Sequence, residues 1–180
     1  MALLFAKNNS MSAITTLPSG IGGGSMNLIS TQTASSSSTI SFTSGIDSTY
    51  KEYIFKFINI HPATNQVAFT FNGSIDSGSN YNVAKTTTYF IARHTENDAT
   101  TELTYETGFD LAQGTGFQSL VRQTGNGNDE CCAGYLHLYD PSSTTFIKHF
   151  MARSYGLLYH FIFYVRIRVS INDVCRYKNF

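Results

Sequence analysis

The chain has 180 residues and a formal net charge of zero, which is enough length for one domain with a sizeable core. Charged residues make up 13%, and Lys and Arg do not cluster among the aromatic residues before residue 150, so nucleic acid is excluded as an expected partner. The three cysteines, Cys131, Cys132 and Cys175, are odd in number and two are adjacent, which excludes a disulfide framework.

The composition predicts an all-β protein. Thr, Tyr and Phe favour strands, Gly, Ser and Asn favour turns, and helix-forming residues are sparse. The apolar run at residues 2–6 has no basic lead and is too short for a signal peptide, so we expect a protein that the general secretory pathway does not export. No membrane partner is expected, because the longest apolar run is far shorter than the roughly 18 uncharged residues of a spanning helix.

Residues 1–27 are predicted to form a flexible N-terminal arm. They contain few strand signals and a glycine loop at Gly20–Ser25. A phosphate-binding loop would need Lys and Ser or Thr after the glycines and then a helix, and neither is present. An arm of this kind offers a way to lace onto a neighbouring subunit.

The clearest strand signal in the chain is Tyr50–Pro62. Its fully apolar face carries Tyr53, Phe55 and Phe57. Its half-apolar face carries Ile54, Ile58 and Ile60 among charged residues. Because both faces are partly apolar, we expect this strand in the middle of a packed sheet.

The rest of the domain, residues 28–153, contains further segments in which apolar and polar residues alternate. These predicted strands are Leu28–Ala34, Thr39–Thr43, Val67–Asn72, Tyr81–Val83, Thr86–His94, Leu103–Tyr105, Ala133–Tyr139 and Thr144–Met151. Val67–Asn72 is predicted to form a hairpin with residues 50–61, and Thr144–Met151 one with Ala133–Tyr139 across a turn at Asp140–Ser143. Residues 107–130 are predicted to be a long loop region. Strands at this spacing predict a β-sandwich or jelly-roll-like single domain.

Residues 154–180 differ in composition from the rest. Residues 1–153 carry 8 Lys and Arg against 11 Asp and Glu, whereas residues 154–180 carry 4 against 1. Residues 157–169 form a dense apolar run with little Gly or Thr. Two interpretations stay open: a buried last strand, and an end encoded in a shifted reading frame.

Cys131, Cys132, His137 and His149 are the residues that could hold a metal. Zinc-binding cysteines are usually separated by two to four residues, and adjacent cysteines are not. A Cys–His nucleophile pair would lack a third, orienting group. The oxygen-rich stretch Asn126–Glu130 lacks the spacing of a calcium loop and is predicted to be a solvated turn.

Carboxylates and tyrosines give weaker signals. Five carboxylates could supply a pair for glycoside hydrolysis, but their spacing selects none: Glu52, Glu102, Glu106, Asp110 and Asp140. Five tyrosines could stack on sugars, although strand tyrosines more often belong to a core or a sheet surface: Tyr81, Tyr89, Tyr105, Tyr135 and Tyr139. We therefore assign no catalytic, metal-binding or cofactor-binding residue, and we expect a protein that is not an enzyme and has no cofactor.

Four stretches of the sequence resemble a group of virion proteins of marine tailed phages. They are Leu28–Pro62, Phe69–Ser74 (Phe-Thr-Phe-Asn-Gly-Ser), Gly134–Thr145 (Gly-Tyr-Leu-His-Leu-Tyr-Asp-Pro-Ser-Ser-Thr-Thr) and Lys148–Phe150 (Lys-His-Phe). The resemblance covers about residues 28–153 and carries no catalytic motif. Members of the group usually continue with strands rich in Ser, Thr and Gly, and residues 154–180 depart from that pattern, which favours the shifted reading frame.

The resemblance implies a non-enzymatic structural protein of the capsid decoration, tail or fibre class. Such a protein would be made in the host cytoplasm and located in the virion, as a homo-oligomer in contact with other virion proteins. The alternative function is a carbohydrate-binding β-sandwich that acts in host attachment through the loops at 107–130, with a glycan as its partner.

Overall fold

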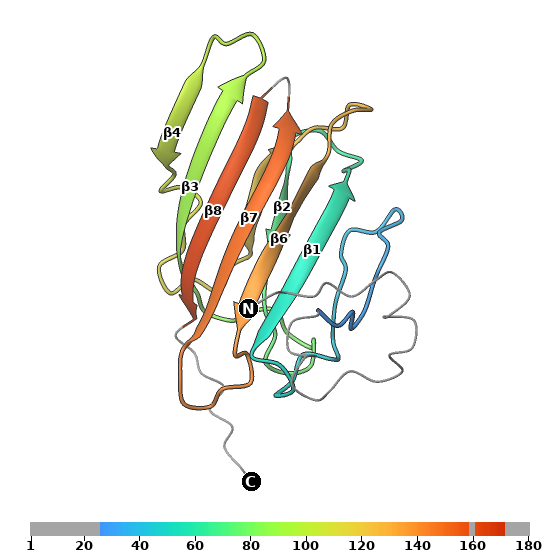
Figure 1. Cartoon of the computed structure of the whole chain (residues 1–180), viewed down its shortest axis with the longest axis vertical. Helices are drawn as coiled ribbons and strands as arrows, with labels where there is room; N and C mark the ends of the chain where they lie inside the picture. Colours follow the sequence, from blue (N-terminus) through green and yellow to red (C-terminus); the bar gives the residue numbers. More distant parts are fainter. Residues whose placement is uncertain (1–25, 159–160, 172–180) are drawn as a thin grey trace, which may run out of the picture. The chain divides into compact units, whose positions relative to one another are not determined.

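The computed structural model describes residues 26–158 and 161–171, the last strand and residues 157–158 by their backbone alone (Figure 1). The chain divides into two compact units, residues 1–33 and residues 34–180. The described part of the first unit, residues 26–33, contains no strand. Throughout the described ranges no helix is present, and therefore none that could cross a membrane.

The second unit is all-β and antiparallel. Its described strands are β1 (Glu52–Ile60), β2 (Val67–Phe71), β3 (Thr86–Thr95), β4 (Thr101–Tyr105), β5 (Gln118–Thr124), β6 (Cys132–Tyr139), β7 (Lys148–Leu158) and β8 (Phe161–Ile171). Six of them form one sheet in the order β1-β6-β7-β8-β3-β4, and β2 pairs with β5 in a second sheet. In Figure 1 the pair β2–β5 lies behind the six-stranded sheet.

The core lies between the two sheets. Phe57 of β1 meets Phe69 of β2 with ring centroids 5.0 Å apart, and Phe71 of β2 meets Phe150 of β7 at 4.9 Å. The Ser154 hydroxyl of β7 donates a hydrogen bond of 2.5 Å to the backbone carbonyl of Leu120 in β5. Because aromatic side chains bury large apolar areas, these contacts hold the second sheet to the first.

The alternation expected for β1 is confirmed up to Phe57. Tyr53 and Phe57 are buried, and Ile58 on the other face is 70% exposed. The prediction for Ile60 is wrong, because this side chain packs against the core. A bulge between Phe57 and Ile60, with Asn59 at a φ of 53°, shifts the register and turns Ile60 to the other face.

Two expectations about the partners of β1 are also wrong. β1 is an edge strand of the six-stranded sheet, where a central strand was expected. It pairs with β6 and not with β2, which pairs with β5. The reason is that the inward side chains of β2 face those of β1 across the core, so the two strands lie in different layers.

The expected strands were found at β2, β3, β4, β6 and β7. The hairpin of β6 and β7 is confirmed, with Leu138 opposite Phe150, and its turn is closed by a 3.1 Å hydrogen bond from Ser143 N–H to Asp140 C=O. The second of these strands begins at Lys148, later than predicted. The segments Leu28–Ala34, Thr39–Thr43 and Tyr81–Val83 are described and are not strands, so those three predictions are wrong.

The expectation of a long loop at residues 107–130 is wrong for its centre. Residues 118–124 form β5, whose first four residues are buried. Gln118 is fully buried, yet its amide oxygen accepts from the Thr87 hydroxyl at 2.6 Å and its amide nitrogen donates to Phe109 C=O at 2.9 Å. These hydrogen bonds satisfy the buried amide of Gln118, one of the polar side chains that made the segment look like a loop.

The C-terminal part of the chain supplies the middle of the sheet. β7 runs through the change of composition at residue 154, and β8 pairs with β7 along one side and with β3 along the other. Residues 172–180 lie outside the described residues. The backbone of β8 is therefore paired on both sides, as a last strand inserted into the sheet.

Gly134 of β6 is the position where the sheet tolerates no side chain. A Cβ there would lie 2.3 Å from Arg153 C=O and 2.7 Å from the ring of Phe57, its cross-strand partner. We expect Gly134→Ala to lower the free energy of unfolding by about 2 kcal/mol, because the Phe57 ring and the β7 backbone would have to move. Urea unfolding followed by circular dichroism measures this change. Gly108→Ala is the control, since a Cβ at Gly108 meets nothing within 4 Å, and equal losses for the two variants would contradict the prediction.

Candidate functional site

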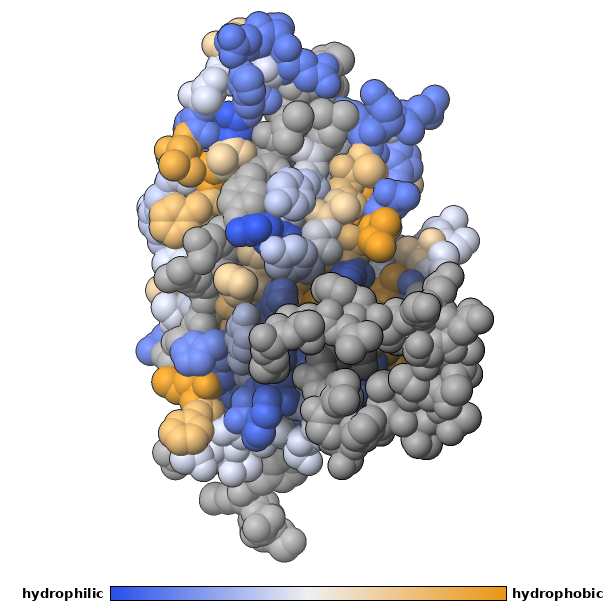
Figure 2. All heavy atoms as spheres, in the orientation of Figure 1, coloured by the Kyte–Doolittle hydropathy of each residue, from blue (hydrophilic) through white to orange (hydrophobic). Residues whose placement is uncertain are grey.

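No described strand covers the face of the six-stranded sheet that is turned away from β2 and β5, and we call it the open face. Figure 2 shows this face in the orientation of Figure 1, with apolar side chains scattered among polar ones. The register of the strands assigns to it the described residues Glu52, Ile54, Lys56 and Ile58 of β1, Tyr135, His137 and Tyr139 of β6, His149, Met151, Arg153 and Tyr155 of β7, Phe90 and Ala92 of β3, and Leu103 and Tyr105 of β4.

A row of three rings runs along β6 on the open face. Tyr135 and His137 meet edge to face with centroids 5.1 Å apart, and His137 stacks on Tyr139 at 6.1 Å. Successive odd-numbered residues of a strand point to the same face, which places the three rings in line. We call Tyr135, His137 and Tyr139 the aromatic row.

Glu52 of β1 fixes the middle ring of this row. Its carboxylate oxygen Oε1 lies 2.5 Å from Nδ1 of His137, and the two side chains are 44% and 21% exposed. Burial, with smaller contributions from the charges of Glu52 and Tyr135, raises the pKa of the Tyr139 hydroxyl above its ordinary value. Tyr139 therefore keeps its proton at neutral pH and can donate a hydrogen bond. Together with the Glu52 carboxylate, the aromatic row presents apolar ring faces, a hydroxyl group and an imidazole on one surface.

The metal set considered from the sequence is not brought together. Cys132 lies on the core face of β6, 1% exposed, whereas His137 lies on the open face. Burial raises the pKa of the Cys132 thiol to about 11, so this thiol keeps its proton at neutral pH and is not an activated nucleophile. His149 lies opposite Tyr139 and not opposite His137. Among the described residues no group of three or more His, Cys, Asp or Glu side chains could hold a metal ion.

The stretch Asn126–Glu130 folds as a turn. Glu130 N–H donates to Gly127 C=O at 2.9 Å, and the Glu130 carboxylate accepts from Gly127 N–H at 2.7 Å. The Glu130 carbonyl lies 2.6 Å from Nδ1 of His61. The carboxylate that a calcium ion would need is therefore directed at the turn's own backbone.

Each of the five candidate carboxylates has its own partner. Their partners are His137 for Glu52, Arg93 for Glu102, Arg122 for Glu106, Tyr105 for Asp110 and Lys51 for Asp140. Glycoside hydrolysis needs two carboxylates that face one bond. Each of these five carboxylates instead contacts a cation, an imidazole or a hydroxyl group.

The five candidate tyrosines divide into three groups. Tyr89 is fully buried in the core, and burial raises its pKa to about 12. Tyr135 and Tyr139 belong to the aromatic row, and Tyr105 lies on the open face at β4, near Phe90. Tyr81 lies outside the strands, where its carbonyl accepts a hydrogen bond from Asn72. Only the β6 tyrosines lie in line on one strand.

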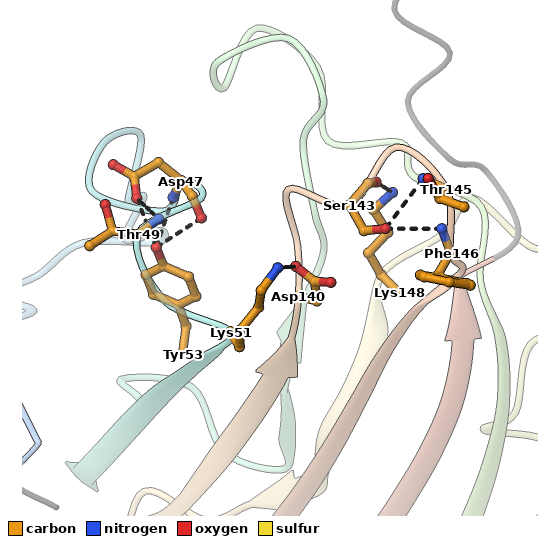
Figure 3. Close-up of polar contacts among 9 residues, drawn as sticks. All are labelled: Asp47, Thr49, Lys51, Tyr53, Asp140, Ser143, Thr145, Phe146 and Lys148. Atoms are coloured by element: carbon orange, nitrogen blue, oxygen red, sulfur yellow. Dashed lines mark hydrogen bonds and ion pairs between the residues drawn. The ribbon is translucent and has the colours of Figure 1, made fainter. Parts of the chain in front are cut away.

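One end of the sheet is fastened by polar contacts (Figure 3). The Tyr53 hydroxyl donates to Oδ1 of Asp47 at 3.0 Å, and Thr49 N–H donates to the same atom at 2.8 Å. Hydrogen bonds from Thr49, and then from Tyr53, hold the pKa of Asp47 below its ordinary value. Nζ of Lys51 lies 3.0 Å from Oδ1 of Asp140. These contacts join the segment before β1 to the turn after β6.

The hydroxyl group of Ser143 orders the turn between β6 and β7. Ser143 Oγ accepts from the N–H groups of Thr145 and Phe146, at 3.3 and 2.9 Å (Figure 3). Nζ of the buried Lys148 donates to the Ser143 carbonyl. The Phe146 side chain is left 71% exposed at the tip of this hairpin.

A buried lysine was missed in the sequence. Lys85 is 1% exposed, and its Nζ donates to Oδ1 of Asn72 at 2.5 Å and to Val83 C=O at 2.7 Å. Burial lowers the pKa of Lys85 to about 8. Asn72 in turn donates to Tyr81 C=O at 2.7 Å and Thr115 C=O at 2.9 Å. A single lysine among Asn and Thr residues gives no signal of this, because its partners come from separate loops.

Comparisons of the chain with protein-family models, curated proteins and solved structures find no match. The function therefore has to be argued from the open face, the sheet edges and the chemistry of the described residues.

Proposed function

We propose that the chain is a non-enzymatic structural protein of a tailed-phage particle, in the capsid decoration, tail or fibre class. It is made in the host cytoplasm, is incorporated into the virion, and assembles with its own copies and with other virion proteins. The observation that carries the proposal is the open face, where large apolar side chains of four strands are exposed. They are Ile58, Phe90, Leu103, Tyr105 and Tyr155. Three of them, Phe90, Leu103 and Tyr105, are neighbours on β3 and β4, with the rings of Phe90 and Tyr105 5.1 Å apart, and a contiguous exposed apolar group is typical of an interaction surface.

The fold class that we propose is a β-sandwich related to the jelly roll, with β2 and β5 as the second layer. The ring contacts between β1 and β2 and between β2 and β7 support two packed layers. A jelly roll has eight strands in two sheets and a Greek-key order. Here six strands share one sheet, so the second layer is small and the open face correspondingly wide.

Mass spectrometry of gradient-purified particles from cells that carry this gene tests the virion assignment. We expect peptides of this chain in the particle fraction, at a copy number that is constant between preparations. A chain that is abundant in the lysate but absent from purified particles would overturn the assignment.

A second candidate function is glycan binding, and the aromatic row favours it. Tyrosine rings stack on the apolar faces of sugars, and the neighbouring carboxylate and hydroxyl can bind sugar hydroxyl groups. Tyr139, His137 and Glu52 supply these groups within one patch. The site would lie on the open face, and not in the loops at 107–130, because β5 occupies the centre of that segment.

A glycan array with the folded protein tests this candidate. We expect Tyr139→Ala to lose the bound glycans, with at least a tenfold weaker signal, because stacking aromatic side chains carry much of such an interface. Tyr105→Ala, on the same face at the other edge of the sheet, is the matched control and should keep them. An array without hits for the wild-type protein removes the candidate.

A further inference from the structure

β4 presents an open backbone edge. Hydrogen bonds from Thr95 N–H to Thr100 C=O and from Glu106 N–H to Tyr89 C=O belong to the β3–β4 ladder. In an antiparallel ladder such pairs alternate along the strands, so the even-numbered residues of β4 bond to β3. The N–H and C=O groups of Thr101, Leu103 and Tyr105 therefore point away from β3. β4 is the last strand of the sheet order, and no described strand pairs with this side.

Few features protect this edge against pairing. Proteins usually blunt an edge strand with Lys, Pro, a bulge or a covering segment. β4 is short and carries Glu102 on its core side, but it contains no Lys or Pro, its register with β3 has no shift, and Leu103 at its centre is 79% exposed. The opposite edge is different: β1 contains Lys56 and a bulge, and the Phe42 ring lies 5.7 Å from that of Phe55. Of the two edges of the six-stranded sheet, the β4 edge is therefore the less protected.

The sequence of β4 is complementary to itself in one antiparallel register. With Leu103 opposite Leu103 of a second copy, Thr101 lies opposite Tyr105, and Glu102 lies opposite Thr104. All three outward-directed residues then bond to outward-directed residues of the second copy. If one strand slides by two residues along the other, in either direction, carboxylates come to face each other. One shift places Glu102 opposite Glu102, and the other places Glu102 opposite Glu106.

We propose that β4 is a homotypic docking edge, at which two copies of this chain join their six-stranded sheets across a twofold axis with Leu103 opposite Leu103. The inference rests on the proposed assembly function and names its contact. Pairing covers the Leu103 side chain with its symmetry mate and gives the edge amides their partners. A contact of one short strand belongs to the weak class of interfaces, with a dissociation constant on the order of 10–100 µM. Within a particle, many linked copies raise its effective strength.

Sedimentation equilibrium of the full chain, from about 5 to 500 µM to bracket that range, tests the docking edge. We expect a reversible dimer, and we expect Leu103→Lys to raise the dissociation constant about tenfold or more, because two ammonium groups would meet at the axis. Ile58→Lys is the matched control: an exposed isoleucine of the same face is changed on the other edge strand, and its dimer should equal that of the wild type. Circular dichroism checks that both variants fold. A chain that stays monomeric, or a dimer that is equally weakened by both variants, overturns the proposal.

A charge pair at residue 104 tests the register. Thr104→Lys should tighten the dimer by roughly threefold, and Thr104→Glu should weaken it by a similar factor, because residue 104 faces Glu102 of the other copy twice in the dimer. Weakening by both variants would instead place residue 104 opposite itself and overturn the register. Sedimentation tests only the dimer, and mass spectrometry of particles tests only the virion assignment. A failure of one proposal can therefore be distinguished from a failure of the other.

Discussion

Phe150→Ala is expected to lower the free energy of unfolding by about 3–5 kcal/mol, the largest effect of any single side chain considered. Phe150 is 2% exposed and lies on the core face of β7, next to the paired Leu138 of β6. Its ring meets Phe71 of β2 at 4.9 Å, edge to face. Removal of the ring takes away both the buried apolar area and a contact between the two sheets, and it leaves a cavity that the paired backbone cannot close.

Urea unfolding followed by far-ultraviolet circular dichroism measures the effect, since the chain has no tryptophan. The matched control is Phe146→Ala in the same hairpin, whose side chain is 71% exposed. That substitution should change the free energy of unfolding by less than about 0.5 kcal/mol. Equal losses for the two variants would mean that Phe150 is not part of a packed interlayer core.

The strands that the sequence predicts well are those with a regular alternation. β3 is an example: Tyr89 and Ile91 are fully buried, and Phe90 between them is 42% exposed. One buried face produces period-two hydrophobicity, which can be read without knowing the strand partners. The same alternation explains why β2 and β6 were also predicted as strands. Their positions in the sheets do not follow from it, because any strand with one apolar face satisfies the pattern.

β5 was missed because its polar residues are buried. Gln118, Ser119 and Thr124 look like loop residues, yet all three are buried next to Leu120 and Val121. Gln118 finds its partners on Thr87 and Phe109, which come from other segments. Burial of a polar side chain is inexpensive only when such partners exist. That information is in the tertiary structure and not in the local sequence.

Pairing between distant strands also hid the candidate site. Tyr135, His137 and Tyr139 alternate along β6, so their common face could be predicted. The contact of His137 with Glu52 could not, because β1 and β6 are separated by four other strands in the sequence. A hairpin between β1 and β2 was the simpler expectation, and it would have left the aromatic row without its carboxylate.

The origin of residues 154–180 stays a prediction. The shifted reading frame was proposed because their composition departs from that of residues 28–153. The structure places β8 between β7 and β3, so residues 154–158 and 161–171 belong to the sheet whatever their origin. Translation of the coding DNA past codon 153 in the other two frames is the direct measurement. A continuation rich in Ser, Thr and Gly would support the shift, and its absence from both frames would contradict it.

Stability should rise with pH above about 8 because of Lys85. Its side chain is 1% exposed and bonds to Asn72 and Val83, and Lys85 is absent from the ion pairs of the described residues. Burial lowers its pKa in the folded chain to about 8, from an ordinary value of 10.5. Below pH 8 both states hold the proton, and the cost of burying the charge is present in full. Between the two pKa values the unfolded chain binds more protons, so the free energy of unfolding increases with pH.

The expected increase is about 1.4 kcal/mol per pH unit, or roughly 3 kcal/mol across the interval. Two groups act in the opposite direction, because burial raises their pKa values in the folded chain: the Cys132 thiol above about pH 9, with a pKa of about 11, and the Tyr89 hydroxyl above pH 10, with a pKa of about 12. The quantity to measure is therefore the difference between the wild type and Lys85→Met, both of which contain Cys132 and Tyr89, in urea unfolding from pH 7 to pH 10.5. That difference should move in favour of the wild type as the pH rises. Lys51→Met, which changes a side chain that is 81% exposed, should follow the wild-type profile. If Lys85→Met also follows the wild-type profile, Lys85 does not titrate between pH 7 and pH 10.5. The cost of burying its charge would then be offset more fully than the two hydrogen bonds imply.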